Sequence, residues 1–446
     1  MKAYPEYKAS GIDWLGDIPR HWKVAPIKTL LSKSSAGVWG DEAKEDGTDI
    51  VCFRVADFDY PRLVLKYNNI TFRNVTPSQV KGREVEYGDI VIEKSGGGDL
   101  NPVGRAVMST YKEKATCSNF MHVISANHRA TNPFLNYLLA TIYGKGLNRL
   151  YFAQTTGIQN LNIRGYLAQR VALPPVAEQE AIVAYLDEVT GKVDALISEK
   201  QKQVEDIRAY RTSLITESVT HGLNPDAPLR PSGIDWLGDI PQHWEIIKSS
   251  YVFDNIGSGT TPTSGEDLYY EGGSVNWLQT GDLNDGVINS TSKKITPFAV
   301  ESKNLKFYNK GSVVIAMYGA TIAKLGLLNI QTTVNQACCV LTPSTNIYSK
   351  YAFYCFYSAK NELISLASGG GQPNISQATI SDFKLPVPPL AEQQAIADFL
   401  DAKTAKIDEL IGELTKQIGE LTEYKQAVIT EAVTGKVDVR DYKPSN

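Results

Sequence analysis

The stretch SGIDWLGDIP at residues 10–19 recurs without change at residues 232–241, and a His-Trp pair follows one residue after each copy. A second block, PPVAEQEAI at residues 174–182, returns as PPLAEQQAI at residues 388–396. The first block is displaced by 222 positions and the second by 214, so the segment between them is eight residues shorter in the second copy. An internal repeat of this kind indicates two related halves. The ends of these halves agree, whereas their middles differ.

Each Pro-Pro block introduces a long segment with the apolar spacing of a helix. Apolar residues recur at intervals of three and four, with one eleven-residue step of the kind that a coiled-coil stutter produces. Pro175 and Pro389 stand where a helix start tolerates proline, and Gly222 and Gly435 where a helix is expected to end. Each helix of about 45 residues would be roughly 65 Å long. The paired spacing favours two long antiparallel coiled-coil helices over amphipathic helices that lie on a globular core.

The two middle segments contain short apolar runs joined by polar loops rich in Gly, Asn, Thr and Tyr. Examples of the runs are DIVI at residues 89–92 and SVVIA at residues 312–316. Short strands between long loops are typical of mixed α/β domains. Binding residues are commonly mounted on loops of this kind.

The net charge of −4 argues against a nucleic-acid partner until the charges are placed along the chain. Between residues 101 and 172 eight bases face one acid, Glu113, whereas both predicted helices carry more acids than bases. The first middle segment is therefore basic enough to bind phosphates. Residues 231–439 contain no arginine, so we expect binding by the second middle segment to weaken less steeply with salt.

Cysteine usage and hydropathy bear on the compartment. The five cysteines form no CxxC pair and no His-bearing metal spacing, which is typical of a reducing compartment. No apolar run approaches the roughly 18 residues that a membrane-spanning helix needs. These features predict a cytoplasmic protein without a metal site.

Motifs for chemistry on DNA are incomplete throughout the sequence. The TGK triplets at residues 190–192 and 434–436 lack the rest of a P-loop. NPF at residues 132–134 has one proline too few for an amino-methyltransferase loop, and Glu93 and Lys94 are adjacent where a metal-dependent nuclease needs a spaced pair. We therefore predict a binding protein that is not an enzyme.

The repeated motifs, GIxWLGxIPxHW and PP-hydrophobic-AEQ, strongly resemble those of the DNA specificity subunits of type I restriction-modification systems. The second middle segment resembles a target-recognition domain of this family in GTTP at residues 259–262, WLQTGD at 277–282, GSVVI at 311–315 and NQ at 335–336. The first is more divergent and matches at residues 88–92 and Asn119. The resemblance covers almost the whole chain.

The resemblance implies an α/β fold in which two mixed α/β target-recognition domains are separated by two long antiparallel coiled-coil helices, with a pseudo-twofold internal repeat. The expected segments are a repeat segment (1–22), target-recognition domain 1 (23–173), a central helix (174–222), a second repeat segment (223–244), target-recognition domain 2 (245–386), a C-terminal helix (387–436) and a tail (437–446).

The resemblance also implies the function and the partners. Each recognition domain would bind one half of an asymmetric bipartite site in double-stranded DNA, and the helices would dock two modification (methyltransferase) subunits. Restriction (helicase-nuclease) subunits would join for cleavage. No cofactor is expected in this chain, whereas S-adenosylmethionine, Mg²⁺ and ATP would belong to the partner subunits.

Candidate residues follow from the chemistry of base edges, because Arg and Lys suit guanine while Asn and Gln suit adenine. The DNA-binding candidates of the first middle segment are Gly97, Arg105, Asn119, His122, Gln159 and Asn160. Those of the second are Gly259, Thr260, Thr261, Gln279, Lys324, Asn335, Gln336, Gln372 and Asn374. The partner-binding candidates on the helices are Ile182, Leu186, Val193, Ile207, Ile396, Leu400, Ile407 and Leu421.

A different class of function remains open from the residues alone. The helices would serve equally in a coiled-coil assembly scaffold whose two domains bind protein or RNA outside any restriction system.

Overall fold

The structure is a computed structural model that describes residues 2–155, 158–369 and 373–443. The chain forms two compact units: unit 1 comprises Met1–Gln201 and Thr415–Asn446, and unit 2 comprises Lys202–Leu414. The chain crosses between the units within two long helices, α4 (Val176–His221) and α11 (Leu390–Val433). Each unit therefore holds one end of each helix, one copy of the repeated segment and one α/β domain. We call residues 23–173 the first domain and residues 245–386 the second domain.

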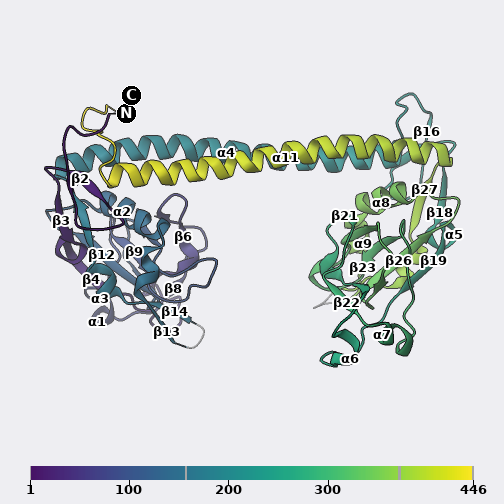
Figure 1. Cartoon of the computed structure of the whole chain (residues 1–446), viewed down its shortest axis with the longest axis horizontal. Helices are drawn as coiled ribbons and strands as arrows, with labels where there is room; N and C mark the ends of the chain where they lie inside the picture. Colours follow the sequence, from purple (N-terminus) through teal and green to yellow (C-terminus); the bar gives the residue numbers. More distant parts are fainter. Residues whose placement is uncertain (1, 156–157, 370–372, 444–446) are drawn as a thin grey trace. The chain divides into compact units, whose positions relative to one another are not determined.

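The first domain is built on two mixed sheets. The larger has the strand order β4-β12-β9-β10-β7-β6 and the smaller the order β11-β5-β8. Strand β12 runs antiparallel to β4 and β9, whereas β10 is parallel to β7 and β11 is parallel to β5. Helix α2 packs against β10 and β12 (Figure 1). The sheet strands and this helix are β4 (Leu31–Ala36), β5 (Ile50–Phe53), β6 (Phe58–Asp59), β7 (Val64–Leu65), β8 (Phe72–Arg73), β9 (Ile90–Glu93), β10 (Ala106–Met108), β11 (Ala115–Cys117), β12 (Met121–Ala126) and α2 (Asn132–Gly144).

Shorter elements complete unit 1. They are β1 (Tyr7–Ala9), β2 (Asp17–Pro19), β3 (Lys23–Pro26), β13 (Phe152–Thr155), β14 (Ile158–Leu161) and β15 (Arg170–Leu173), the helices α1 (Pro77–Val80) and α3 (Ile163–Leu167), and the 3₁₀ turns η1 (Ile27–Leu30), η2 (Val55–Asp57) and η3 (Leu147–Tyr151). Strands β3 and β15 pair antiparallel at the two ends of the first domain, next to the start of α4.

The second domain repeats this topology. Its larger sheet has the order β19-β26-β23-β24-β21, with β21 parallel to β24, and its smaller sheet the order β22-β20-β25, with β20 parallel to β25. The elements of these sheets are β19 (Phe253–Ser258), β20 (Val275–Leu278), β21 (Gly286–Ile288), β22 (Lys293–Ile295), β23 (Val313–Ala316), β24 (Leu325–Leu328), β25 (Thr333–Val334) and β26 (Cys338–Pro343).

The remaining elements of unit 2 are β16 (Leu229–Pro231), β17 (Asp239–Pro241), β18 (Glu245–Lys248), β27 (Lys384–Val387), α5 (Ser249–Val252), α6 (Asp267–Tyr270), α7 (Pro297–Ser302), α8 (Ser349–Ser358), α9 (Lys360–Ser365), α10 (Gln377–Asp382), η4 (Thr280–Asp282) and η5 (Gly319–Thr321). Two domains with unlike sequences therefore fold in the same way, and the prediction of two mixed α/β domains is confirmed.

Helices α4 and α11 run antiparallel in each unit. In unit 1 the Lys425 ammonium lies 2.6 Å from the Asp194 carboxylate, and in unit 2 the Arg211 Nε lies 2.9 Å from the Asp408 carboxylate. These pairs occupy equivalent places in the repeat. Gly222 and Gly435 follow the helix ends with positive φ, as the sequence predicts. No helix in the described part of the chain combines the length and the apolar composition needed to cross a membrane.

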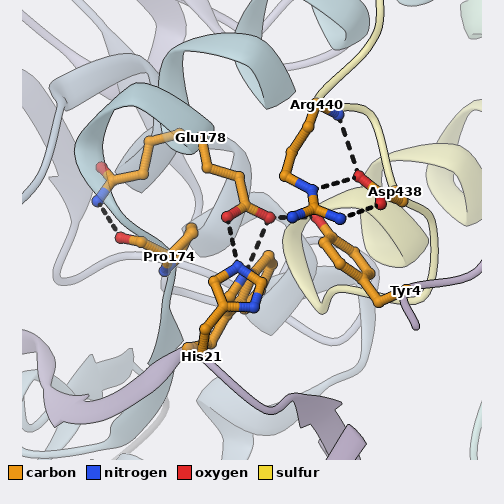
Figure 2. A network of polar contacts seen from close by, with 8 residues as sticks. Tyr4, His21, Pro174, Glu178, Asp438 and Arg440 are labelled. Atoms are coloured by element: carbon orange, nitrogen blue, oxygen red, sulfur yellow. Dashed lines mark hydrogen bonds and ion pairs between the residues drawn. The ribbon is translucent and has the colours of Figure 1, made fainter. Parts of the chain in front are cut away.

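The glutamate of the repeated Glu-Gln pair binds the repeated His-Trp pair. In unit 1 the Glu178 carboxylate accepts a hydrogen bond from Trp22 Nε1 at 2.9 Å, lies 2.8 Å from His21 Nε2 and also accepts from the Tyr4 hydroxyl (Figure 2). Its side chain is only 5% exposed. Buried carboxylates need such donors, so the network fixes the N-terminal segment on the start of α4.

Unit 2 contains the same joint with fewer donors. The Glu392 carboxylate accepts from Trp244 Nε1 at 3.1 Å and lies 2.9 Å from His243 Nε2. Position 226, which corresponds to Tyr4, is an aspartate, and the Glu392 side chain is 29% exposed. The two joints are therefore equivalent in design but unequal in burial.

The glutamine of the same pair binds the domain that precedes it. Gln179 Oε1 accepts from the Thr131 amide at 2.9 Å, and Gln393 Oε1 accepts from the Tyr348 amide at 2.8 Å. Both side chains are fully buried. The Glu-Gln motif therefore ties one repeat segment, one helix and one domain together in each unit.

The chain ends meet in unit 1. Lys2 and Asp438 form an antiparallel bridge, and a Cβ at Gly435 would lie 2.4 Å from Pro19. Leu15 and Ile18 share a hydrophobic core with the last turns of α11. The N-terminal repeat segment therefore packs against the end of α11 within unit 1.

Candidate nucleic-acid interface

A pocket opens at one end of the first-domain sheets. Its volume is about 590 Å³, and its lining comes from the ends of β4, β5, β9 and β11. The lining residues are Trp39, Arg54, Val55, Ala56, Glu93, Ser95, Gly96, Ser118, Asn119 and Phe120. Phe120 is 49% exposed, and Asn119 is exposed beside it. An aromatic surface bordered by polar side chains has the composition of a site for nucleobases.

The wall of this pocket is fixed by arginine contacts. Arg73 stacks over the Trp39 ring, with 4.6 Å from its Cζ to the ring centroid, and donates to the carbonyls of Trp39 and Gly40. Arg54 Nη2 donates to the Asn69 carbonyl at 3.3 Å and lies 3.4 Å from the Asp57 carboxylate. The wall is therefore preorganised by the domain itself.

The equivalent place in the second domain follows from shared backbone hydrogen bonds. Ser118 N donates to Phe53 O, and Asn335 N donates to Leu278 O. In the same way, the amides of Arg54 and Gln279 each donate to an aspartate three residues later. Arg54 and Asn119 of the first domain therefore correspond to Gln279 and Gln336 of the second.

The polar side chains at this second site differ from those of the first. The Thr261 hydroxyl donates to Gln336 Oε1, and Gln279 is half-buried. Thr261 occupies the place of Trp39, and Ala337 the place of Phe120. One backbone scaffold thus presents an aromatic, cationic site in the first domain and an amide-rich site in the second.

Comparison with protein families decides what this scaffold is. The family model described as "Type I restriction modification DNA specificity domain" matches residues 41–206 and again residues 241–420. The chain belongs to this family. Both matches include one domain and most of the helix that follows, so the specificity subunit contains two copies of the family's domain.

Individual relatives agree with this assignment. The chain is 24% identical over 278 residues to the specificity subunit of the Escherichia coli type I restriction enzyme EcoR124I/EcoR124II, a match that spans 59% of this chain and 62% of that protein. A Methanocaldococcus jannaschii protein assigned as the MjaX specificity subunit is 22% identical over 432 residues, or 96% of each chain. A chain of a solved type I R-M system matches with a TM-score of 0.71 at 19% identity, covering 94% of this chain and 99% of that one, which supports the fold.

Family membership makes this chain a DNA specificity subunit, which recognises DNA without catalysing a reaction. The alternative of an unrelated assembly scaffold is not favoured. Among the described residues no three His, Cys, Asp or Glu side chains are grouped as a metal site would require, and the five cysteines are buried and free.

Several predicted DNA-binding residues of the specificity subunit are engaged inside the first domain. Arg105 binds Glu93 through two hydrogen bonds of 2.8 and 3.2 Å, and the Glu93 side chain is 2% exposed. Two of the Arg105 donor atoms therefore neutralise a buried carboxylate, and the contact of Arg105 with a base stays a prediction. A Cβ at Gly97 would lie 2.5 Å from Val103 N, so this glycine permits close backbone packing rather than forming a phosphate nest.

The side chains of Gln159 and Asn160 also bind their own domain. Gln159 Oε1 accepts from Val103 N at 3.4 Å, and Asn160 Oδ1 accepts from the Ser95 hydroxyl at 2.6 Å. Both are half-buried. Their contacts close the loop that borders the pocket, which gives them a structural role that the sequence did not distinguish from DNA binding.

His122 lies on β12 beside Ser34, with 2.8 Å between its Nε2 and the hydroxyl. Burial, followed by the nearby Lys94 charge, lowers the pKa of His122 to about 4. The ring is therefore neutral at neutral pH and adds no positive charge for a phosphate.

The predicted residues of the second domain divide between exposed and structural positions. Thr260, Lys324, Gln336 and Asn374 are exposed, and Gln279, Thr261 and Asn335 are half-buried. Asn335 Oδ1 accepts from the Ala337 amide at 3.2 Å. A Cβ at Gly259 would lie 1.6 Å from Val334 O, so packing requires this glycine. Gln372 lies outside the described residues.

The predicted partner-binding side chains are mostly enclosed. Ile182, Leu186, Ile396 and Leu400 are fully buried in the cores of the two units, and Val193 is buried as well. For these five residues direct partner contact stays a prediction, and in this structure their apolar side chains are buried within the chain. Ile207, Ile407 and Leu421 are half-buried.

Sequence reasoning missed Arg54, Trp39 and Phe120. The signal that would have found Arg54 is the aspartate shared by FRVAD at residues 53–57 and LQTGD at residues 278–282. Aligning these aspartates places Arg54 on Gln279.

Proposed function

We propose that this specificity subunit binds one bipartite DNA sequence, with the first domain recognising one half and the second domain the other. The observation that carries the proposal is the pair of equivalent sites at Arg54 and Gln279, which share a backbone scaffold and differ in side-chain chemistry. Unlike donor and acceptor sets select unlike base edges. By family resemblance we expect an unspecified gap of fixed length between the half-sites.

We further propose that two copies of a modification subunit dock on the helices. Exposed large apolar residues of α4 and α11 come in repeat-related pairs: Val176 with Leu390, Leu196 with Leu410, and Tyr210 with Tyr424. The last two pairs give each unit one exposed leucine and one exposed tyrosine at equivalent positions. Identical surfaces in two otherwise unlike units are suited to two identical partners. Exposed aromatic residues commonly anchor such interfaces.

The rest of the assembly follows from the family. Restriction subunits would join this complex for cleavage, and S-adenosylmethionine, Mg²⁺ and ATP would be bound by the partner subunits. A complex of this kind acts on DNA in the cytoplasm.

The test of DNA recognition is single-molecule methylation sequencing of cells that express this chain with its modification subunit. The control is a cell that expresses the modification subunit alone. Methylated bases at one bipartite motif, present only with this chain, are expected. A complex that assembles without producing any motif would contradict the proposal.

Docking is tested with the double variant Tyr210→Ala and Tyr424→Ala. Native mass spectrometry of the copurified complex should show loss of both modification subunits, whereas each single variant should lose one copy. Tyr251→Ala is the matched control, because Tyr251 is 79% exposed in the second domain. Two modification subunits retained by the double variant would refute docking at these tyrosines.

A further inference from the structure

The two equivalent sites differ most in the residue that follows the inner strand of the smaller sheet. Arg54 follows β5 in the first domain, and Gln279 follows β20 in the second. Both backbone amides are held by a carboxylate three residues later, at 2.7 Å from Asp57 and 2.9 Å from Asp282. The two side chains therefore leave the backbone from the same fixed point.

Part of the Arg54 guanidinium is hydrogen-bonded within the first domain, and the rest is not. Its Nη2 is used by the Asp57 carboxylate and the Asn69 carbonyl, and the Asp57 side chain is 4% exposed. Its Nε is buried and has no partner among the described residues. A guanidinium has five N–H donors in a rigid plane, so the two N–H groups of Nη1 remain for a ligand in the pocket that Arg54 lines.

The surroundings of Arg54 limit what that ligand is. Trp39 and Phe120 supply flat apolar surface in the same pocket, and Asn119 is exposed at its border. A phosphate would be favoured by an open cationic surface, whereas apolar side chains such as Phe120 are suited to contact base edges in the major groove. Asp57 also neutralises part of the arginine charge, which favours hydrogen bonding over simple attraction to a phosphate.

We propose that Arg54 selects a guanine in the half-site of the first domain and that Gln279 selects an adenine in the half-site of the second. The two N–H donors of Nη1 match the O6 and N7 acceptors of guanine, whereas an amide, with one donor and one acceptor, matches N6 and N7 of adenine. This inference rests on the proposed function, since it assigns a base to each of the two sites.

The test exchanges the two side chains in the full modification complex. Arg54→Gln, Arg54→Lys and Gln279→Arg are compared with the wild type by single-molecule methylation sequencing. In Arg54→Gln, methylation at the wild-type motif should fall roughly 10- to 100-fold, with relaxation or replacement of one guanine in one half-site. In Gln279→Arg, one adenine of the other half-site should change. Each variant should leave the opposite half-site intact.

Two controls separate selection from structure. Arg62→Gln removes an arginine that is 65% exposed and paired with Asp59, and it should keep the wild-type motif. Arg54→Lys keeps the charge but loses the paired donors, so it should lower discrimination at the same guanine. If Arg54→Gln does not fold, Gln279→Arg and Arg54→Lys still decide the question.

The outcomes distinguish this inference from the proposed function. A wild-type complex with no bipartite motif would overturn the proposed function itself. A wild-type motif that stays unchanged in Arg54→Lys and Gln279→Arg would overturn only the assignment of bases. Weakening that is uniform over all sequences, with no base changed, would show that Arg54 binds a phosphate and would also overturn the assignment.

Discussion

The first and second domains share strand order and the direction of every corresponding strand pair, yet their sites differ in side-chain chemistry. The first places an arginine and two aromatic residues where the second places Gln279, a threonine and an alanine, whereas both place an amide at Asn119 and Gln336. The residues that anchor each domain to its helix are the same in both, namely the Glu-Gln pair and the His-Trp pair. The comparison teaches that the repeated sequence encodes the joints, whereas the divergent sequence encodes the sites.

The largest difference is expected from the glycines that allow close backbone approach beside each site. A Cβ at Gly259 would lie 1.6 Å from Val334 O, and one at Gly37 would lie 2.3 Å from Cys117 O. Gly259→Ala should destabilise unit 2 by about 3 kcal/mol, and Gly37→Ala should destabilise unit 1 by about 2 kcal/mol. Hydrogen exchange resolved by unit measures both effects.

Matched controls for these substitutions are Gly281→Ala and Gly98→Ala, where an added Cβ meets nothing within 4 Å. Equal exchange in all four variants would show that the sheets adjust freely, and the shared scaffold would then be less rigid than the contacts indicate.

The second prediction concerns the unequal joints. Glu178→Ala should leave the donors of Trp22 and Tyr4 buried without an acceptor, at a cost of about 2–3 kcal/mol to unit 1. Glu392→Ala should cost unit 2 about 1 kcal/mol, because the Glu392 carboxylate is more exposed and water can replace it. Denaturant midpoints followed by tryptophan fluorescence, with hydrogen exchange to assign the unit, provide the measurement. A larger loss in unit 2 would mean that burial does not set the strength of the joint.

The last prediction is a pH dependence of the first domain. The pKa of His122 is about 4 in the folded protein, below its usual value of about 6.5. The unfolded chain therefore binds a proton first, so stability is complete above about pH 6.5 and declines as pH falls toward 4. His122→Gln should flatten this decline in unit 1, as measured by urea midpoints at pH 7.5 and 5.

The exposed His128 supplies the control substitution, His128→Gln, which should leave the decline as steep as in the wild type. An unchanged decline in His122→Gln would show that other groups govern it.

Much of the fold was predictable because its signals are local or repeated. Apolar spacing predicted two long helices, and the structure begins them at Val176 and Leu390, directly after the Pro-Pro pairs. Gly222 and Gly435 marked their ends through the backbone conformation that glycine favours. The exact repeat indicated that its two copies make equivalent contacts, although it did not show which groups bind there.

The site was predictable only in part, because the groups that a side chain binds are often distant in sequence. Arg105 looked like a base-reading arginine, but its Nε and Nη2 bind Glu93 on the neighbouring strand. Arg54 was not among the predicted residues. Asp57 and Asn69 bind only part of its guanidinium, and Arg54 lines a pocket. The apolar helix residues were predicted to bind partner subunits, and five of them are buried within this chain.

The sequence by itself determined the duplication, the long helices, the α/β class of the two domains and the family. Periodicity and repeats carry that information because they are properties of neighbouring residues. Only the tertiary structure decided that Glu178 and Gln179 are a joint, that Arg54 corresponds to Gln279, and that Leu196, Tyr210, Leu410 and Tyr424 remain exposed. Those facts arise from hydrogen bonds and burial between distant segments, which exist only once the chain has folded.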